Sequence, residues 1–130
     1  MTTLLLDETV FEDFCAGYGG AKQLLDRIMD GSVSAYVSPL TIVNLWRNGD
    51  LNRKSEIAYR SILTFTEEIQ LNLDMAIAAG RAMVSVVLDE EQQKLDYFGL
   101  ISSIASQCGY TICTRRPDKF SIFDCDVLTY

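Results

Sequence analysis

The stretch Thr3-Leu4-Leu5-Leu6-Asp7 is an apolar run that stops at a carboxylate. A short run with no polar interruption is typical of a strand buried on both faces, as in the middle of a parallel sheet. Thr9-Val10-Phe11 follows as a short helix, and Gly17-Tyr18-Gly19-Gly20 reads as a loop. We therefore expect Asp7 at the carboxyl end of a central strand.

Outward from this stretch, the apolar spacing alternates between helical and strand-like segments. Helices are predicted over residues 22–29, from Pro39 to about Asn48, and over 55–67, 74–88 and 95–108, with Ser38 and Asp74 as N-caps. Strands are predicted over residues 33–37, 69–71, 110–114 and 125–130. This alternation predicts an α/β fold with a mostly parallel sheet of four or five strands and helices on both faces.

The size and composition favour one globular domain. The chain has 130 residues, of which 48% are hydrophobic, with 2 prolines and 8 glycines. No repeat or linker divides it, so we expect one domain over residues 1–130. The opening has no basic leader and its apolar run is too short for a membrane span, which makes a cytoplasmic location the default expectation.

The charged and titratable residues exclude several classes of function. A net charge of −7 argues against a protein that coats nucleic acid electrostatically. The chain has no histidine, which removes His-based acid/base catalysis and the Ser-His-Asp and Cys-His nucleophile systems. The 4 cysteines form no CxxC pair, so buried small apolar residues are a better interpretation than an all-cysteine zinc site.

The carboxyl ends of the predicted strands bring polar residues to one edge of the sheet. Asp7, Ser38 and Thr114 each follow a predicted strand, and in open parallel sheets ligands bind beyond these ends. Four sequence segments carry the pattern in this order: Leu4 to Val10, Val37 to Leu45, Leu73 to Gly80, and Gly99 to Ala105 with Gly109 and Thr114-Arg115. Together they resemble the PIN-domain family, which includes the toxin ribonucleases of bacterial toxin–antitoxin pairs.

The resemblance implies a Rossmann-like three-layer fold and a metal-dependent ribonuclease scaffold. In that family about four carboxylates at the strand ends hold one or two Mg²⁺ or Mn²⁺ ions, which activate water and stabilise charge on the scissile phosphate. Asp7 matches the first of these acids, and Glu8 stands where a small hydroxyl residue is usual. Asn44 stands at the second acid and keeps a carbonyl oxygen without the negative charge.

The third and fourth acids are displaced in the same register. Phe98 stands where the third acid belongs, with Asp96 two residues earlier, and Asp96 could serve only if the helix started after it. Its alternative role is an N-cap of that helix. Arg116 stands at the fourth position, where it would repel a divalent ion, and Asp118 lies two residues further.

These departures predict a PIN-like domain that is catalytically weakened or inactive. The weakened set is Asp7, Asn44, Asp96 and Asp118, with Asp7 and Asp96 as metal ligands and Mg or Mn as cofactor only if the site is active. Arg115, Arg116 and Lys119 are candidate nucleic-acid contacts, although a solvated loop explains them equally well. The cleft would then bind RNA or an antitoxin-like protein.

Two alternatives remain open from the sequence. One is an active Mg- or Mn-dependent endoribonuclease of toxin–antitoxin type, and the other is an unrelated doubly wound α/β domain. Substitution of Asn44 by Glu would separate a dormant nuclease from a non-catalytic PIN-like domain, because it should strengthen metal binding only in the dormant nuclease. If Arg116 fills the cleft instead, we expect the new carboxylate to pair with Arg116 and raise stability. We also expect a homo-oligomer formed through the helix that carries Trp46 and the helix from about Ser55.

Overall fold

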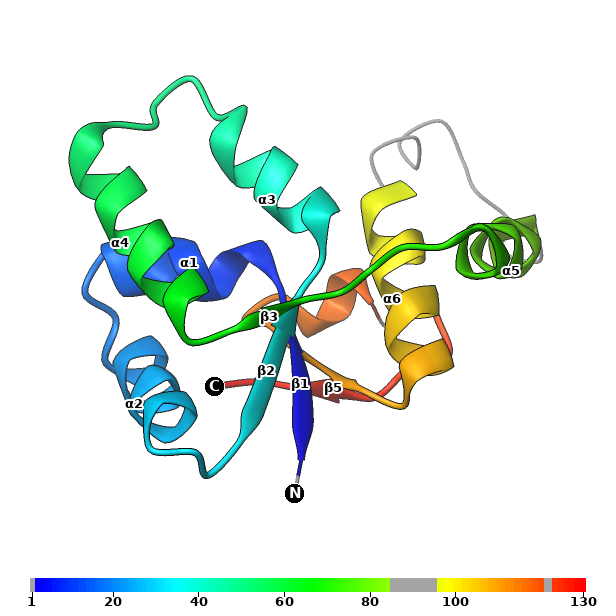
Figure 1. Cartoon of the computed structure of the whole chain (residues 1–130), viewed down its shortest axis with the longest axis horizontal. Helices are drawn as coiled ribbons and strands as arrows, with labels where there is room; N and C mark the ends of the chain where they lie inside the picture. The colour runs from blue at the N-terminus through cyan, green and yellow to red at the C-terminus, as the bar shows by residue number, and fades with distance from the viewer. Residues whose placement is uncertain (1, 85–95, 121–122) are drawn as a thin grey trace.

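The computed structural model describes residues 2–84, 96–120 and 123–130. Its elements alternate along the chain as drawn in Figure 1. The strands are β1 (Thr3–Leu6), β2 (Ser34–Val37), β3 (Glu67–Glu68), β4 (Thr111–Cys113) and β5 (Val127–Leu128). The helices are α1 (Glu8–Cys15), α2 (Gly19–Met29), α3 (Pro39–Trp46), α4 (Arg53–Thr64), α5 (Leu73–Val84), α6 (Asp96–Cys108) and the 3-10 turn η2 (Pro117–Lys119).

The five strands form one sheet in the order β3-β2-β1-β4-β5, and every pair of neighbours is parallel. β1 is therefore the central strand, paired to β2 through Thr3–Ser34 and to β4 through Leu6–Cys113. Asp7 directly follows this strand. The predicted α/β class, the parallel sheet and the place of Asp7 are confirmed.

Alternate side chains of β1 build two separate cores. Leu4 and Leu6 pack on one face of the sheet with buried side chains of α1, α2 and α4, among them Phe11. Leu5 packs on the other face with α6 and with Phe120. Figure 1 shows α1, α2 and α4 on one side of the sheet and α5 and α6 on the other. All three leucines are at most 1% exposed, which is why the sequence shows a continuous apolar run here.

Of two predicted helix starts, one is capped as expected and one differs. Ser38 caps α3 as predicted, since its side chain accepts a hydrogen bond from the Leu40 amide at 3.2 Å. Asp74 is not the cap of α5, because that helix already begins at Leu73. Asn72 takes the role instead, with its side-chain oxygen 2.9 Å from the amide nitrogen of Met75. The first residue of this helix, Leu73, is apolar, so the sequence pattern did not mark it as a helix start.

Two other boundaries differ. The loop expected over Gly17 to Gly20 is shorter, because Gly17 completes the turn at φ 83° and α2 already begins at Gly19. The strand expected over residues 69–71 is β3 at Glu67–Glu68, and thus begins two residues earlier. Ile69 donates its amide to the Val37 carbonyl at 2.9 Å and buries its side chain, so its apolarity reflects packing beside the strand rather than membership of it. Residues 85–88 of the predicted fifth helix and Leu95 lie outside the described residues.

Within the ranges that the structure describes, no helix has the length and apolar character needed to span a membrane. The cysteines are free thiols in differing environments. Cys113 is buried in the core, where burial raises the pKa of its thiol to about 12, as expected of a small apolar residue. Cys108 is exposed, against that expectation, because it is the last residue of α6.

Candidate functional site

β1 and β4 bring Asp7 and Thr114 together at the carboxyl edge of the sheet. The two strands are hydrogen-bonded neighbours, and the Asp7 amide extends their ladder by donating to the Cys113 carbonyl at 3.0 Å. Thr114 then lies beside Asp7, with its hydroxyl oxygen 2.7 Å from Oδ2 of that residue. Both side chains are fully buried. A charged group at such a position requires compensation from its neighbours.

Asp7 receives that compensation through five hydrogen bonds from described residues. Oδ1 accepts from the Tyr97 hydroxyl at 2.9 Å and from Nη2 of Arg116 at 3.0 Å. Oδ2 accepts from Nε of Arg116 at 2.9 Å, from the Thr114 hydroxyl at 2.7 Å and from the Thr9 hydroxyl at 3.3 Å. Both carboxylate oxygens are thereby engaged, and the guanidinium binds them side by side.

Arg116 is turned inward, onto the end of the central strand. Its amide donates to the Thr114 hydroxyl at 3.0 Å, and its guanidinium carbon lies 4.6 Å from the centre of the Phe98 ring. Burial by itself would lower the pKa of Arg116, but the hydrogen bonds and negative charge of Asp7, with the charge of Glu8, raise it above the usual arginine value. Arg116 is therefore a fixed cation at every accessible pH.

Glu8 joins Arg116 to Asn44. Its Oε2 accepts from Nη2 of Arg116 at 3.4 Å, and its Oε1 accepts from Nδ2 of Asn44 at 2.7 Å. The sequence led us to expect that a carboxylate at position 44 would pair with Arg116. The structure differs, because the Asn44 amide contacts Glu8 and Glu8 already supplies the second charge to Arg116. Glu8 thus contributes the compensating charge that its unusual position suggested.

Tyr97 connects this group of residues to α3. Its hydroxyl lies 2.9 Å from Oδ1 of Asp7 and 2.9 Å from the hydroxyl oxygen of the buried Thr41. Burial, followed by the charge of Asp7, holds the pKa of Tyr97 well above its usual value. Tyr97 is therefore a neutral donor to Asp7. We define the strand-end cluster as Asp7, Glu8, Thr9, Thr41, Asn44, Tyr97, Phe98, Thr114 and Arg116.

The structure brings the family-register positions together. Positions 7, 98 and 116 are in contact, and Asn44 joins them through Glu8. Asp118 lies on η2 with an exposed side chain. α6 begins at Asp96, whose side chain lies outside the described residues. Its expected role as a metal ligand or an N-cap therefore stays a prediction.

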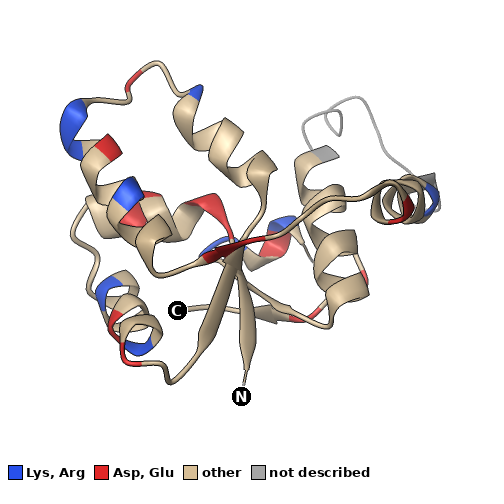
Figure 2. Cartoon of the chain, in the orientation of Figure 1, with Lys and Arg blue, Asp and Glu red and all other residues tan. Residues whose placement is uncertain are grey.

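The two other basic candidates point away from the cluster or into solvent. Arg115 forms an ion pair with Asp13 at 3.4 Å and stacks over the Tyr18 ring, with its guanidinium carbon 3.9 Å from the ring centre. Lys119 is exposed on η2. Figure 2 shows the described Lys and Arg positions on several different elements. With Arg116 turned inward, the predicted nucleic-acid patch is reduced to Arg115 and Lys119.

The residues at the strand ends do not fit the Mg²⁺ or Mn²⁺ that the fold resemblance implies. Hard cations need several oxygen ligands, mostly carboxylates, with free lone pairs. Here both oxygens of Asp7 accept hydrogen bonds, position 44 offers an N–H to its neighbour, and positions 98 and 116 carry a ring and a cation. In the part of the chain that the structure describes, no three Asp, Glu or Cys side chains are grouped to hold a metal ion.

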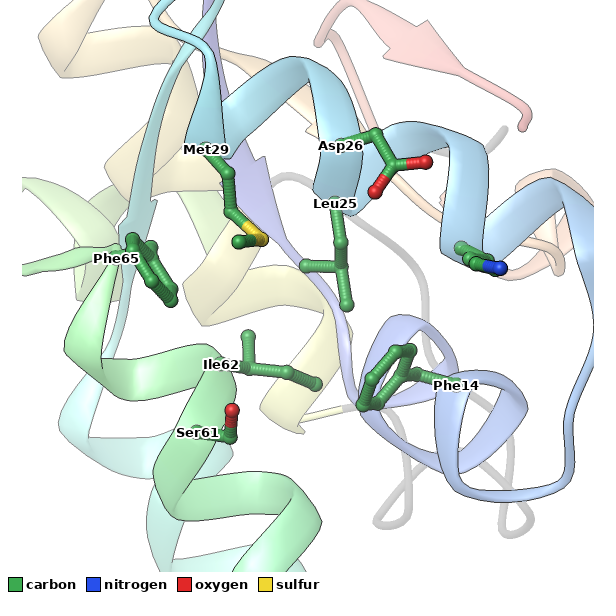
Figure 3. A pocket seen from close by; sticks show the side chains of 8 residues that line it. Phe14, Leu25, Asp26, Met29, Ser61, Ile62 and Phe65 are labelled. Atoms are coloured by element: carbon green, nitrogen blue, oxygen red, sulfur yellow. The ribbon is translucent and has the colours of Figure 1, made fainter.

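A separate apolar pocket of about 230 Å³ lies between α1, α2 and α4. Figure 3 shows Leu25 and Met29 of α2 facing Ile62 of α4 and Phe65 directly after α4, with Phe14 of α1 closing one end. Lys22, Asp26 and Ser61 complete its lining. Met29 is 56% exposed and Phe65 46% exposed, so apolar surface remains in contact with solvent around this pocket.

Sequence reasoning missed Tyr97 and the hydroxyl residues of the cluster. Tyr97 is adjacent to Phe98, which the family register had already placed at the site. Because α6 begins at Asp96, Tyr97 lies in the first turn of this helix, and that position was the signal that could have identified it. Thr114 was placed at a strand end but given no role. Thr9 and Thr41 carried no distinguishing pattern, because hydroxyl residues are common in the first turns of helices.

Known structures share this architecture, although the sequence alone finds no match. No protein-family model matches, and no curated protein matches significantly. VapBC2 from Rickettsia felis, bound to a DNA fragment from their promoter, is similar with a TM-score of 0.77 and 12% identity over 99% of both chains. VapBC-1 from nontypeable Haemophilus influenzae is similar with a TM-score of 0.69 and 11% identity over 98% of both chains. FitAcB from Neisseria gonorrhoeae is similar with a TM-score of 0.63 and 17% identity over 96% of both chains.

These likenesses show the fold, because identities this low do not extend to chemistry. The chain shares the fold of these VapBC and FitAcB structures, as the order of its motifs led us to expect. Whether the chain cleaves RNA has to be argued from its own strand-end cluster.

Proposed function

We propose that this chain is a non-catalytic PIN-like domain of toxin–antitoxin type, which acts by binding a protein partner. The observation that carries the proposal is the paired contact between Asp7 and Arg116, at 2.9 and 3.0 Å. The one acid that matches the family cleanly is thereby neutralised within the chain. A carboxylate in this state is a poor ligand for a second cation.

Charge supports this proposal over an active endoribonuclease. Asp7 and Glu8 bring two negative charges to the cluster, and Arg116 cancels one of them. A metal-dependent phosphodiesterase needs enough negative charge to hold a divalent ion against the phosphate it must attract. Asn44 and Phe98 add none, so the balance favours the loss of metal-dependent cleavage.

The described surface supports a protein partner better than RNA. Arg115 and Lys119 form no joint patch with the inward-turned Arg116, whereas the pocket between α1, α2 and α4 presents a mostly apolar lining. Such a pocket suits the apolar face of a helix or an extended segment, with Lys22 and Asp26 available for polar contacts at its edge. The similar structures belong to the two-component VapBC and FitAcB systems, which favours an antitoxin-like chain as the occupant.

Three coarser expectations stay part of the proposal. We propose that residues 1–130 act as one domain, that the protein works in the cytoplasm, and that it self-associates. For self-association, α3 and α4 leave Val43 and Ile57 exposed at 56% and 59%. Trp46 is less available, since it packs on the core through an edge-to-ring contact with the buried Tyr59. Sedimentation at high micromolar concentration would detect a strict monomer.

Two assays test the proposed function. The first incubates the protein with fluorogenic RNA in Mn²⁺ and in EDTA, with Asp7→Asn as control, and the proposal expects no cleavage that EDTA removes. EDTA-sensitive cleavage that Asp7→Asn abolishes would establish the endoribonuclease instead. The second compares partner capture from cells by the wild type, Phe65→Asp and Leu73→Asp. Leu73 is 74% exposed on α5 and does not line the pocket, so only Phe65→Asp should lose the partner.

A further inference from the structure

Helix α5 presents an apolar face to solvent. Leu73 and Ile77 are 74% and 43% exposed, and their spacing places both side chains on one side of the helix. Of the described residues of α5, only Ala79 is buried, and the helix packs against α6. Figure 1 shows α5 at the periphery of the molecule, beside α6. Leu73 and Ile77 thus form an aliphatic surface that the described chain does not cover.

Gly80, about one turn after Ile77, is not explained by the fold of a single chain. It is exposed within α5, and a Cβ added to it would meet no described atom within 4 Å. Its φ is not positive, so the backbone does not require a glycine either. Glycine is also the poorest helix former after proline. A second chain that packs closely on this face gives the missing side chain a physical reason, because glycine permits close approach to the helix backbone.

The charges beside this face are arranged symmetrically along the helix. Asp74 and Arg81 are the charged residues of α5, and both are exposed. They lie about two turns apart, which places them on the same flank of the helix, next to Ile77. Among the described residues, neither takes part in an ion pair. The midpoint between the acid and the base falls beside Ile77, so turning the helix end for end about this residue exchanges their places.

We propose that α5 is a self-association surface, on which α5 of a second copy of this chain packs in the antiparallel direction. The inference rests on the proposed self-association and names its surface. In this arrangement Ile77 lies over Gly80 of the other copy, and Asp74 lies beside Arg81 of the other copy. A two-fold axis makes each contact twice. A parallel arrangement is disfavoured, because it would bring like charges together at both ends of the face.

The apolar residues of α4 offer a weaker case for a second copy. Ile57 is 59% exposed, but charges near it on α4 are already paired within the helix, since Nη2 of Arg60 lies 3.2 Å from Oε1 of Glu56. Charges that are satisfied within one helix gain less from an opposite charge on a second chain. Ile57 is therefore a matched control for Ile77, because both are exposed isoleucines on helices.

The first experiment measures the dimer dissociation constant of the full chain by sedimentation equilibrium. The wild type and Ile57→Asp should dimerise alike, whereas Ile77→Asp should dimerise at least about tenfold more weakly. Gly80→Gln fills open space in the monomer without adding an apolar surface, so it should weaken the dimer while circular dichroism shows an unchanged fold. A dimer that Ile57→Asp disrupts and Ile77→Asp leaves intact would overturn the inference.

Charge reversal tests the antiparallel direction. Asp74→Arg gives a helix with two positive charges, and Arg81→Asp gives one with two negative charges, so each variant alone should dimerise more weakly than the wild type. An equimolar mixture of the two should recover the wild-type affinity, because each charge then meets its opposite. A mixture that associates no better than the single variants would contradict the antiparallel pairing.

These outcomes are separable from partner capture, because the pocket proposed for the partner lies between α1, α2 and α4. Ile77→Asp should capture the partner as well as the wild type does, and Phe65→Asp should still dimerise. A wild type that stays monomeric at high micromolar concentration, but captures a partner through the pocket, would overturn the α5 dimer and leave the proposed partner binding in place.

Discussion

The guanidinium of Arg116 binds both carboxylate oxygens of Asp7, with Nε 2.9 Å from Oδ2 and Nη2 3.0 Å from Oδ1. The two residues are far apart in sequence and meet because β1 and β4 are parallel neighbours in the sheet. Their contact joins the central strand to the segment before η2. It therefore stabilises the fold at the edge of the sheet where the family resemblance implies the catalytic acids.

Removal of Arg116 should be costly. Arg116→Ala leaves the fully buried Asp7 without its ionic partner, and breaking a buried pair from one side costs about 3 kcal/mol or more. Arg115→Ala removes a pair whose arginine side chain is 41% exposed, which is expected to cost less than about 1 kcal/mol. Urea unfolding of both variants in EDTA measures the difference. Similar losses of stability in the two variants would show that the Asp7–Arg116 pair stabilises the fold no more than the Asp13–Arg115 pair.

Removal of both partners should cost much less than removal of one. A buried ion pair can often be replaced by apolar residues of similar volume with little loss of stability. We expect Asp7→Leu combined with Arg116→Met to be more stable than Arg116→Ala alone, since no uncompensated charge remains. Chemical denaturation of the single and double variants completes a double-mutant cycle. Strictly additive losses would contradict direct coupling of the two side chains.

A carboxylate at position 44 should destabilise the protein. The Asn44 amide donates to Glu8 at 2.7 Å, and Asn44→Glu would replace this bond by repulsion between like charges. The expected loss is about 1 to 2 kcal/mol, which reverses the gain anticipated from the sequence. Adding Glu8→Gln should recover part of it, because the glutamine can donate to the new carboxylate. A more stable Asn44→Glu would mean that position 44 reaches Arg116 after all.

Glu12 should make stability pH-dependent. Loss of water around its carboxyl group, followed by the negative charges of Glu8 and Asp7, raises the pKa of Glu12 above its ordinary value of 4.5, although Arg116 opposes this. The folded state then binds a proton more tightly than the unfolded state, so stability falls as pH rises from 4.5 through the raised pKa. Glu12→Gln should therefore match the wild type near pH 4 and unfold at a higher temperature at pH 7. If the difference in unfolding temperature between Glu12→Gln and the wild type were the same at pH 4 and pH 7, Glu12 would make no such contribution.

The sheet could be predicted from sequence because its central strand is buried on both faces. Leu4, Leu5 and Leu6 have to be apolar wherever they point, which leaves a continuous run that ends at Asp7. Parallel pairing then places the ends of neighbouring strands together. The β3 position was less predictable, since the pairing of Glu67 and Glu68 is a backbone property that their exposed side chains do not reveal.

The cluster itself could be predicted only in part. The family register pointed to positions 7, 44, 98 and 116, and the structure brings these positions together. The direction of the Arg116 side chain could not be read from sequence, because an arginine in a loop can equally face solvent. The contact of Asn44 with Glu8 could not be predicted for the same reason: a pattern gives the position of a residue along the chain, whereas its partner depends on side-chain geometry.

The most direct test of the account is a calorimetric titration of Mn²⁺ into the wild-type protein. An internal guanidinium that occupies both oxygens of Asp7 leaves no free carboxylate pair, so we predict no stoichiometric binding at metal concentrations up to about 1 mM, the range of weak protein sites. One ion bound per chain with a micromolar dissociation constant, and lost in Asp7→Asn, would contradict the account. It would mean that Arg116 leaves the cluster and that the metal site of a nuclease is retained.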